Sequence, residues 1–210
     1  MRSRSRGLLP FLVFLLAGAC CLAAQSKNPE DLAAGKILVA PRNSSDPIFS
    51  KSVILLVRYD KTGALGLMVN HRTTLAISRA LPGVKGAARD SDPVFIGGPV
   101  ELSGVFALAR TPAKPEDETN IFGNIYFITT KTALEKTLDR NPNPSQLRIY
   151  LGYCGWAPHQ LENEVLEGRW YIFDRSEAEA FDAKPSTLWL RLVSKTEQRF
   201  ARLRSALPVR

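Results

Sequence analysis

Histidine is scarce in this chain of 210 residues, which contains only His71 and His159. Neither lies near cysteine, aspartate or glutamate at the spacing of a metal site. Proton transfer in enzymes commonly uses a histidine or a pair of carboxylates with perturbed pKa values, and no motif presents such a pair. We therefore expect no metal site, no cofactor and no catalytic residues of a recognised type.

Cysteine is almost as rare, because two of the three cysteines, Cys20 and Cys21, lie in the N-terminal segment. A chain processed after that segment keeps Cys154 alone and has no intramolecular disulfide. Cys154 and His159 could form a nucleophile and base where a strand ends and a helix begins. The favoured interpretation is a buried, inert thiol and a surface histidine.

Signatures of nucleic-acid binding are missing: the sequence has no RNP motif, no helix-turn-helix pattern and no zinc knuckle. The formal net charge is +8, of which Arg2, Arg4 and Arg6 supply three units. A basic amphipathic segment closes the chain at 196–207, and we expect it to dock on the protein's own sheet rather than on a membrane.

The N-terminal segment is built like an export signal. Three arginines without acidic partners precede an apolar run at 8–19 and the small residues Cys20, Cys21, Ala23 and Ala24. A membrane-spanning helix needs about 20 apolar residues, and this segment is shorter and contains Pro10. We expect residues 1–24 to be a signal peptide, cut between Cys20 and Gln25; an uncleaved anchor or a cytosolic tail are the alternatives.

Cys20 follows Leu16-Ala17-Gly18-Ala19, which is close to a lipid-attachment pattern but one residue out of register. Lipidation of Cys20 would attach the chain to a membrane, whereas cleavage near Ala24 would release it. Either route predicts an exported protein in the periplasm or at the envelope.

The remaining chain alternates irregularly between short strand and helix patterns, which favours one α+β domain over a doubly wound parallel sheet. Residues 25–34 form a leader, and residues 35–207 form the domain. The expected strands are 36–40, 52–59, 64–69, 94–96, 105–109, 125–129, 147–153, 169–174 and 187–193. The turn residues Asp60-Lys61-Thr62-Gly63 predict an antiparallel hairpin of the strands 52–59 and 64–69. The expected helices are 73–81, 131–138, 158–167 and 196–207, the third with Pro158 in its first turn and Gly168 just beyond its end.

Two glycine-rich runs are the candidate binding motifs. Gly97-Gly98-Pro99 lacks the lysine and serine that a phosphate loop requires, so a close turn is the expected role. In the second run, glycines flank aromatic rings at a strand-to-helix junction, where helix N–H groups could bind an anion. Packing of its rings in the core is the favoured alternative; the run comprises Gly152, Tyr153, Cys154, Gly155 and Trp156.

Five segments in order resemble the YqgE/AlgH family. They are Gly35-Lys36-Ile37-Leu38-Val39-Ala40, Phe49-Ser50-Lys51-Ser52-Val53-Ile54-Leu55-Leu56, Gly63-Ala64-Leu65-Gly66-Leu67-Met68-Val69-Asn70, Gly97-Gly98-Pro99-Val100, and the run from Gly152 to Glu164. The resemblance implies an α+β fold with a bifurcated, partly barrel-like sheet that is mostly antiparallel, in a family often labelled as transcriptional regulators of alginate production.

This chain departs from the family at three points. Relatives usually carry alanine where Cys154 stands and glycine where His159 stands, so these two residues cannot be the family's shared chemistry. Relatives also look cytosolic, which makes the cytoplasm the alternative location for this protein and argues against direct transcriptional control by an exported chain.

Two classes of function stay open. The favoured one is a non-enzymatic regulatory or binding module for an unidentified small ligand or protein partner. The other is an enzyme of unrecognised mechanism that uses the glycine-rich run at 97–98 and the Tyr153-Trp156 region. The candidate ligand-binding residues are Asn70, Gly97, Gly98, Pro99, Gly152, Tyr153, Gly155, Trp156 and Gln160.

Overall fold

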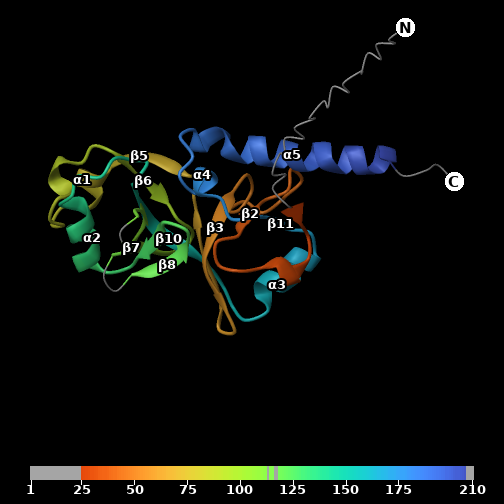
Figure 1. Cartoon of the computed structure of the whole chain (residues 1–210), viewed down its shortest axis with the longest axis horizontal. Coiled ribbons are helices and arrows are strands. Elements are labelled where there is room, and N and C mark those ends of the chain that lie inside the picture. The colour runs from red at the N-terminus through yellow and green to blue at the C-terminus, as the bar shows by residue number, and fades with distance from the viewer. Residues whose placement is uncertain (1–24, 113, 116–117, 207–210) are drawn as a thin grey trace, which may run out of the picture.

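The strand β10 (Leu147–Trp156) joins the two halves of one curled sheet (Figure 1). Its first half pairs with β7 and, in parallel, with β6, whereas its last three residues pair with β4. The computed structural model describes residues 25–112, 114–115 and 118–206. Over this range the protein is a single α+β domain with a bifurcated half-barrel sheet, which confirms the expected fold class.

The main path of the sheet runs β1-β11-β2-β3-β4-β10-β7-β9-β8, and β5 and β6 branch from β10. All pairs are antiparallel except that between β6 and β10. The other strands are β1 (Gln25–Ser26), β2 (Ile37–Val39), β3 (Val53–Asp60), β4 (Gly63–Met68), β5 (Arg72–Ala76), β6 (Pro93–Ile96), β7 (Val100–Arg110), β8 (Thr119–Phe122), β9 (Ile125–Ile128) and β11 (Tyr171–Phe173).

The helices cover the faces and ends of this sheet (Figure 1). They are α1 (Ile77–Ala80), α2 (Lys131–Leu138), α3 (Gln160–Leu166), α4 (Glu177–Ala180) and α5 (Pro185–Ala206), with 3-10 turns at Pro29–Asp31 and Ala87–Arg89. Thr130 caps α2, where its hydroxyl accepts a hydrogen bond from the Ala133 amide, as expected for threonine at a helix N-terminus.

The hairpin of β3 and β4 confirms the expected antiparallel pair. Asp60 accepts a hydrogen bond from the Thr62 amide at 2.7 Å, and Gly63 adopts φ +122°, a conformation that suits glycine. Both strands are buried over most of their length, because sheet and helices cover both faces, and this explains their nearly continuous apolar sequence.

Two sequence-based assignments were wrong. Residues 187–193, expected to form a strand, lie inside α5. Leu188, Leu192 and Thr196 are buried at four-residue intervals, which is helical spacing, and Pro185 occupies the first turn. Docking of the segment 196–207 was expected through apolar side chains that lie outside the described side chains, so it stays a prediction.

Residues 73–81 were expected to be helical throughout. The structure divides them between β5 and the one-turn helix α1. Pairing of β5 with β6 accounts for the difference, because tertiary pairing outweighs a weak local helix pattern.

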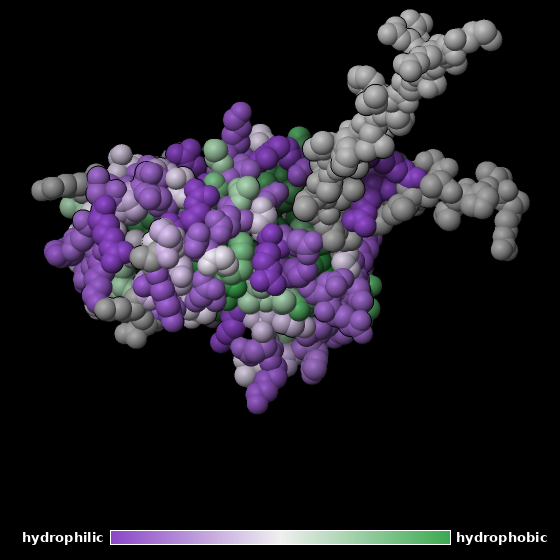
Figure 2. Space-filling model, viewed as in Figure 1, coloured by the Kyte–Doolittle hydropathy of each residue, from purple (hydrophilic) through white to green (hydrophobic). Residues whose placement is uncertain are grey.

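Polar residues dominate the face shown in Figure 2. None of the described helices is long and apolar enough to cross a membrane. The expected signal peptide and Cys20 lie outside the described residues.

Candidate functional site

Trp156 belongs to an aromatic cluster that packs beside α3. Its ring stacks on Phe49 at 6.4 Å between centroids and meets Trp170 edge-on at 6.3 Å. One carboxylate oxygen of Glu164 accepts hydrogen bonds from both indoles, at 2.9 Å from Trp156 and 2.8 Å from Trp170. Trp156 is only 5% exposed, so its ring belongs to the core, as the favoured interpretation of the motif expected.

Gln160 extends this network on the exposed side of α3. Its amide oxygen accepts a hydrogen bond from the Ala157 backbone, and its amide nitrogen donates to the second oxygen of Glu164 at 3.0 Å. His159, just before α3, is exposed and adopts φ +63°. Glycine enters that left-handed region without strain, which is the physical reason why glycine suits this position.

The two glycine-rich runs meet each other backbone to backbone. A Cβ atom on Gly98 would lie 2.1 Å from the Tyr153 carbonyl carbon, and one on Gly97 would lie 2.2 Å from the Gly152 oxygen. Gly152 adopts φ +70° at the bulge where β10 changes partners. The glycines therefore allow residues 97–98 to lie directly against residues 152–154 of β10. We call this contact the crossing, and it is the point at which the sheet divides.

Cys154 is fully buried at this crossing, and its thiol donates to the Gly97 carbonyl at 3.3 Å. Burial raises the pKa of the thiol well above its usual range, so it stays protonated at neutral pH. A buried neutral thiol is a poor nucleophile, which supports the inert interpretation of Cys154.

Of the other candidates, Tyr153 packs edge-on against Phe106 at 5.5 Å, while Pro99 and Gly155 are exposed. Asn70 lies apart from the crossing: its side chain accepts from the Val53 amide at 2.8 Å and donates to the Lys51 carbonyl at 2.9 Å. The candidates other than Pro99 and Gly155 thus have a packing or hydrogen-bonding role, and ligand binding by all of these residues stays a prediction.

A serine and a histidine that the sequence analysis did not pair lie in contact. Ser52 Oγ is 3.1 Å from His71 Nε2. The hairpin register could have revealed this, because Ile54 pairs with Met68, which places Ser52 opposite the residue before His71. Ser52 is fully buried, so its hydroxyl does not reach a substrate in this conformation.

We expect His71 to make stability depend on pH. Burial lowers its pKa below 6.5, so as the pH falls below about 6.5 the unfolded chain takes up a proton before the folded chain does. The free energy of unfolding should therefore decrease as the pH falls from 7 to 5.5. Denaturant titrations at each pH should show a smaller decrease for His71→Gln, whereas the exposed control His159→Gln should match the wild type. Equal slopes in all three proteins would contradict the prediction.

A cleft of about 410 Å³ is lined by residues of β5, β6, the start of β10 and the segment that joins α4 to α5. Its lining carries three charged side chains, Arg72, Asp92 and Arg148, and the rings of Phe95 and Phe181. Burial, followed by repulsion from Asp90, raises the pKa of Asp92, and Arg72 opposes the rise. Pockets of this size commonly hold small molecules.

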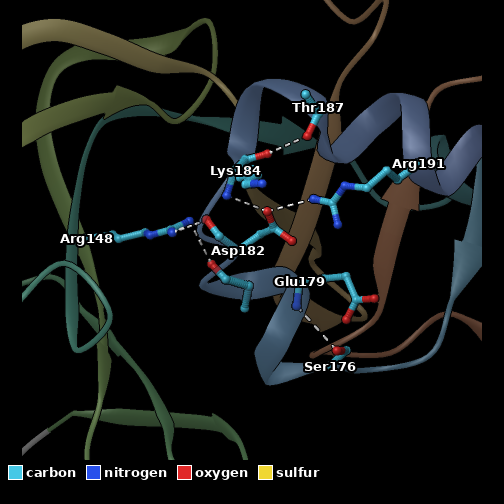
Figure 3. A network of polar contacts seen from close by, with 8 residues as sticks. Arg148, Ser176, Glu179, Asp182, Lys184, Thr187 and Arg191 are labelled. Atoms are coloured by element: carbon cyan, nitrogen blue, oxygen red, sulfur yellow. Dashed lines mark hydrogen bonds and ion pairs between the residues drawn. The ribbon is translucent and has the colours of Figure 1, made fainter.

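Arg148 is the unusual residue of this cleft, because it is only 6% exposed. Its guanidinium donates to the backbone carbonyls of Ala180 and Asp182 at the end of α4 (Figure 3). The rings of Phe95 and Phe181 lie 5.0 and 5.4 Å from its central carbon, within the range of cation–π attraction. The Asp182 carboxylate instead binds Arg191 and the Lys184 amide.

Sequence reasoning missed Arg148 as a site residue. Within the predicted strand, Arg148 was one charged residue in an apolar run. Whether its side chain is buried depends on the residues that surround it in the folded protein. Its contacts with residues 180–182 join segments more than 30 positions apart. The only available signal was a charged residue inside an otherwise apolar strand, since such residues are rarely buried.

A family model described as AlgH-like matches residues 37–201. The chain belongs to the AlgH-like family. Curated relatives agree: UPF0301 proteins of Streptomyces avermitilis and Paracoccus denitrificans are 31% and 36% identical to it. The matches cover 80% and 74% of this chain, and 88% and 85% of the relatives. The resemblance seen in the sequence is thereby confirmed.

Two solved structures share the AlgH-like fold. AlgH from Pseudomonas aeruginosa aligns with a TM-score of 0.65 at 23% identity, over 84% of this chain and 95% of that chain. Protein DIP2367 from Corynebacterium diphtheriae aligns with a TM-score of 0.66 at 21% identity, over 77% and 86%. Both support the fold alone.

Proposed function

We propose that this AlgH-like protein is a non-enzymatic regulatory or binding module that holds a small ligand in the Arg148 cleft. The observation that carries the proposal is the cleft itself, a hollow of ligand size with a buried cation and two aromatic rings in its lining. A concave, mainly apolar surface with a few polar groups is the usual form of a binding site.

Burial of the two side chains that were considered as nucleophiles supports a role without catalysis. Ser52 and Cys154 are both fully buried, and nucleophilic catalysis requires contact with a substrate. The enzyme alternative would use the region of Asn70, Gly97-Gly98 and Tyr153-Trp156, where the polar groups of Asn70 and Trp156 already bond within the protein.

A fragment library tests this function. We expect some fragments to shift the amide resonances of residues that line the cleft, such as Phe95 and Ser145, and to be recovered chemically unchanged. Ala183→Trp places a large ring at the exposed edge of the cleft and should abolish these shifts, while the control Leu166→Trp on α3 should retain them. Conversion of a fragment by the wild type would favour the enzyme, and shifts confined to other surfaces would refute the cleft as the site.

Export is the second part of the proposal, supported by the arginines, apolar run and small residues at 2–24. Intact mass of the protein purified from its native host should correspond to a chain that starts between Cys20 and Gln25. A mass that includes residues 1–19 would overturn export, and an added diacyl mass on Cys20 would identify a lipoprotein attached to the envelope.

A further inference from the structure

The Arg148 guanidinium is buried and forms no ion pair with a described carboxylate; the Asp182 carboxylate attracts it through space but binds Arg191. Among the described residues its hydrogen-bond acceptors are two backbone carbonyls, which use two of its five N–H groups. Burying a cation costs several kcal/mol unless it is paired. Carbonyl dipoles and the two phenylalanine rings offset part of this cost, and the guanidinium keeps donors for a further acceptor.

A second unsatisfied group lies beside it on β10. Arg148 and Tyr150 occupy the same face of the strand, since alternate residues of a strand point the same way, and both contact the Phe95 ring. The fully buried Tyr150 hydroxyl lies near the Arg148 guanidinium and interacts with it, but it has no well-formed hydrogen bond to a described residue. Burial raises the pKa of Tyr150 to about 12, although the charge of Arg148 opposes the rise. This hydroxyl is therefore neutral at pH 7, and Tyr150 supports Arg148 from behind the residues that line the cleft.

The charges that line the cleft favour an anion. Arg72 and Arg148 supply two positive charges against the single carboxylate of Asp92, and no ion pair joins either arginine to a described residue. Much of the remaining lining is apolar and rigid, with Pro93, Pro144 and Pro185 among its residues.

We infer that the cleft takes a small organic carboxylate, an anion on a flat apolar body, with Arg148 as its anchor and Arg72 as the charge at its rim. A guanidinium binds a carboxylate through two parallel N–H donors, and the rings of Phe95 and Phe181 offer surfaces to a flat body. This inference rests on the proposed function and adds the ligand class.

Three benzene derivatives of similar size test it: the anion benzoate, its neutral isostere benzamide and the cation benzylammonium. Binding is followed by titration of the cleft amide resonances in the full-length protein. We expect benzoate to bind at least about tenfold more tightly than benzamide, because a charge-assisted hydrogen bond is about twice as strong as a neutral one. Benzylammonium should not bind. Benzamide binding as tightly as benzoate would overturn the inference.

Variants at the rim keep the test independent of folding, which loss of the buried Arg148 would disturb. Arg72→Gln should weaken benzoate about fivefold, and Asp92→Asn should strengthen it by about the same factor, as expected for one unit charge a few ångströms away in water. The control Arg58→Gln removes an exposed arginine on β3 and should leave benzoate affinity unchanged.

Arg148→Lys keeps the charge but loses the paired donors, so a folded Arg148→Lys protein should bind benzoate more weakly than the wild type. An unchanged affinity in Arg72→Gln and Asp92→Asn would refute the inference. If neutral fragments occupy the cleft while benzoate does not, the ligand class is wrong and the binding function stands. If neither benzoate nor neutral fragments bind in the cleft, both the ligand class and the proposed binding function are refuted.

Discussion

Trp156→Ala is expected to lower the free energy of unfolding by about 3–5 kcal/mol, the usual cost of truncating a buried tryptophan. The ring is 5% exposed and contacts both Phe49 and Trp170. Its removal leaves a cavity and takes one of two indole donors from Glu164. Domain stability is typically about 5–15 kcal/mol, so the variant should retain only a small margin.

Denaturant titration measures this effect, and two companions show its origin. Trp156→Phe should be milder, because it keeps a ring beside Phe49 and loses the hydrogen bond to Glu164. Leu166→Ala, at a position of α3 that is 71% exposed, should change stability by less than about 0.5 kcal/mol. A Trp156→Ala protein with the wild-type midpoint and impaired ligand binding would show that the ring acts in recognition instead of packing.

Gly98→Ala is expected to be at least as damaging, with a loss above about 4 kcal/mol or failure to fold. The new methyl group would lie 2.1 Å from the Tyr153 carbonyl carbon, 2.2 Å from its oxygen and 2.4 Å from the Cys154 nitrogen. These atoms belong to β10, which joins both halves of the sheet. Relief of the clash therefore requires a shift of the central strand rather than of one side chain.

Gly168→Ala is the matched control. Gly168 adopts φ +75° and has no atom within 4 Å of the position a Cβ would take, so alanine there has only the strain of a left-handed conformation, about 1–2 kcal/mol. Comparison of the two denaturation midpoints separates steric exclusion from backbone strain. Similar midpoints for Gly98→Ala and Gly168→Ala would show that β10 shifts to accommodate the methyl group at little cost. The glycine run would then serve another purpose.

The two variants also bear on what the family shares. Gly98 and Trp156 belong to the segments that identify the chain as AlgH-like; in this structure Gly98 allows a close backbone approach to β10, and Trp156 packs in the core. A family motif of this kind can mark a fold requirement as well as a ligand site. The Arg148 cleft lies outside those segments, so its ligand could differ among relatives.

The local sequence determined those helices and strands that are specified by residues only a few positions apart. Asp60 to Gly63 between two apolar runs predicted the β3–β4 hairpin, because turn residues and flanking strands act at short range. Pro158 and Gly168 similarly bounded the region of α3. The order of five short motifs gave the family, and with it the bifurcated sheet.

Tertiary structure alone decided the rest. Residues 187–193 read as a strand by composition, yet they are helical because their buried positions face a core built from distant segments, as the hydrogen bond from Trp189 to the Ala40 carbonyl across 149 positions illustrates. Glu164 gained its two indole donors, and Arg148 its carbonyls and rings, from parts of the chain that only folding brings together. Burial of a charge and the shape of a cleft depend on such long-range contacts, so no local pattern in the sequence could specify them.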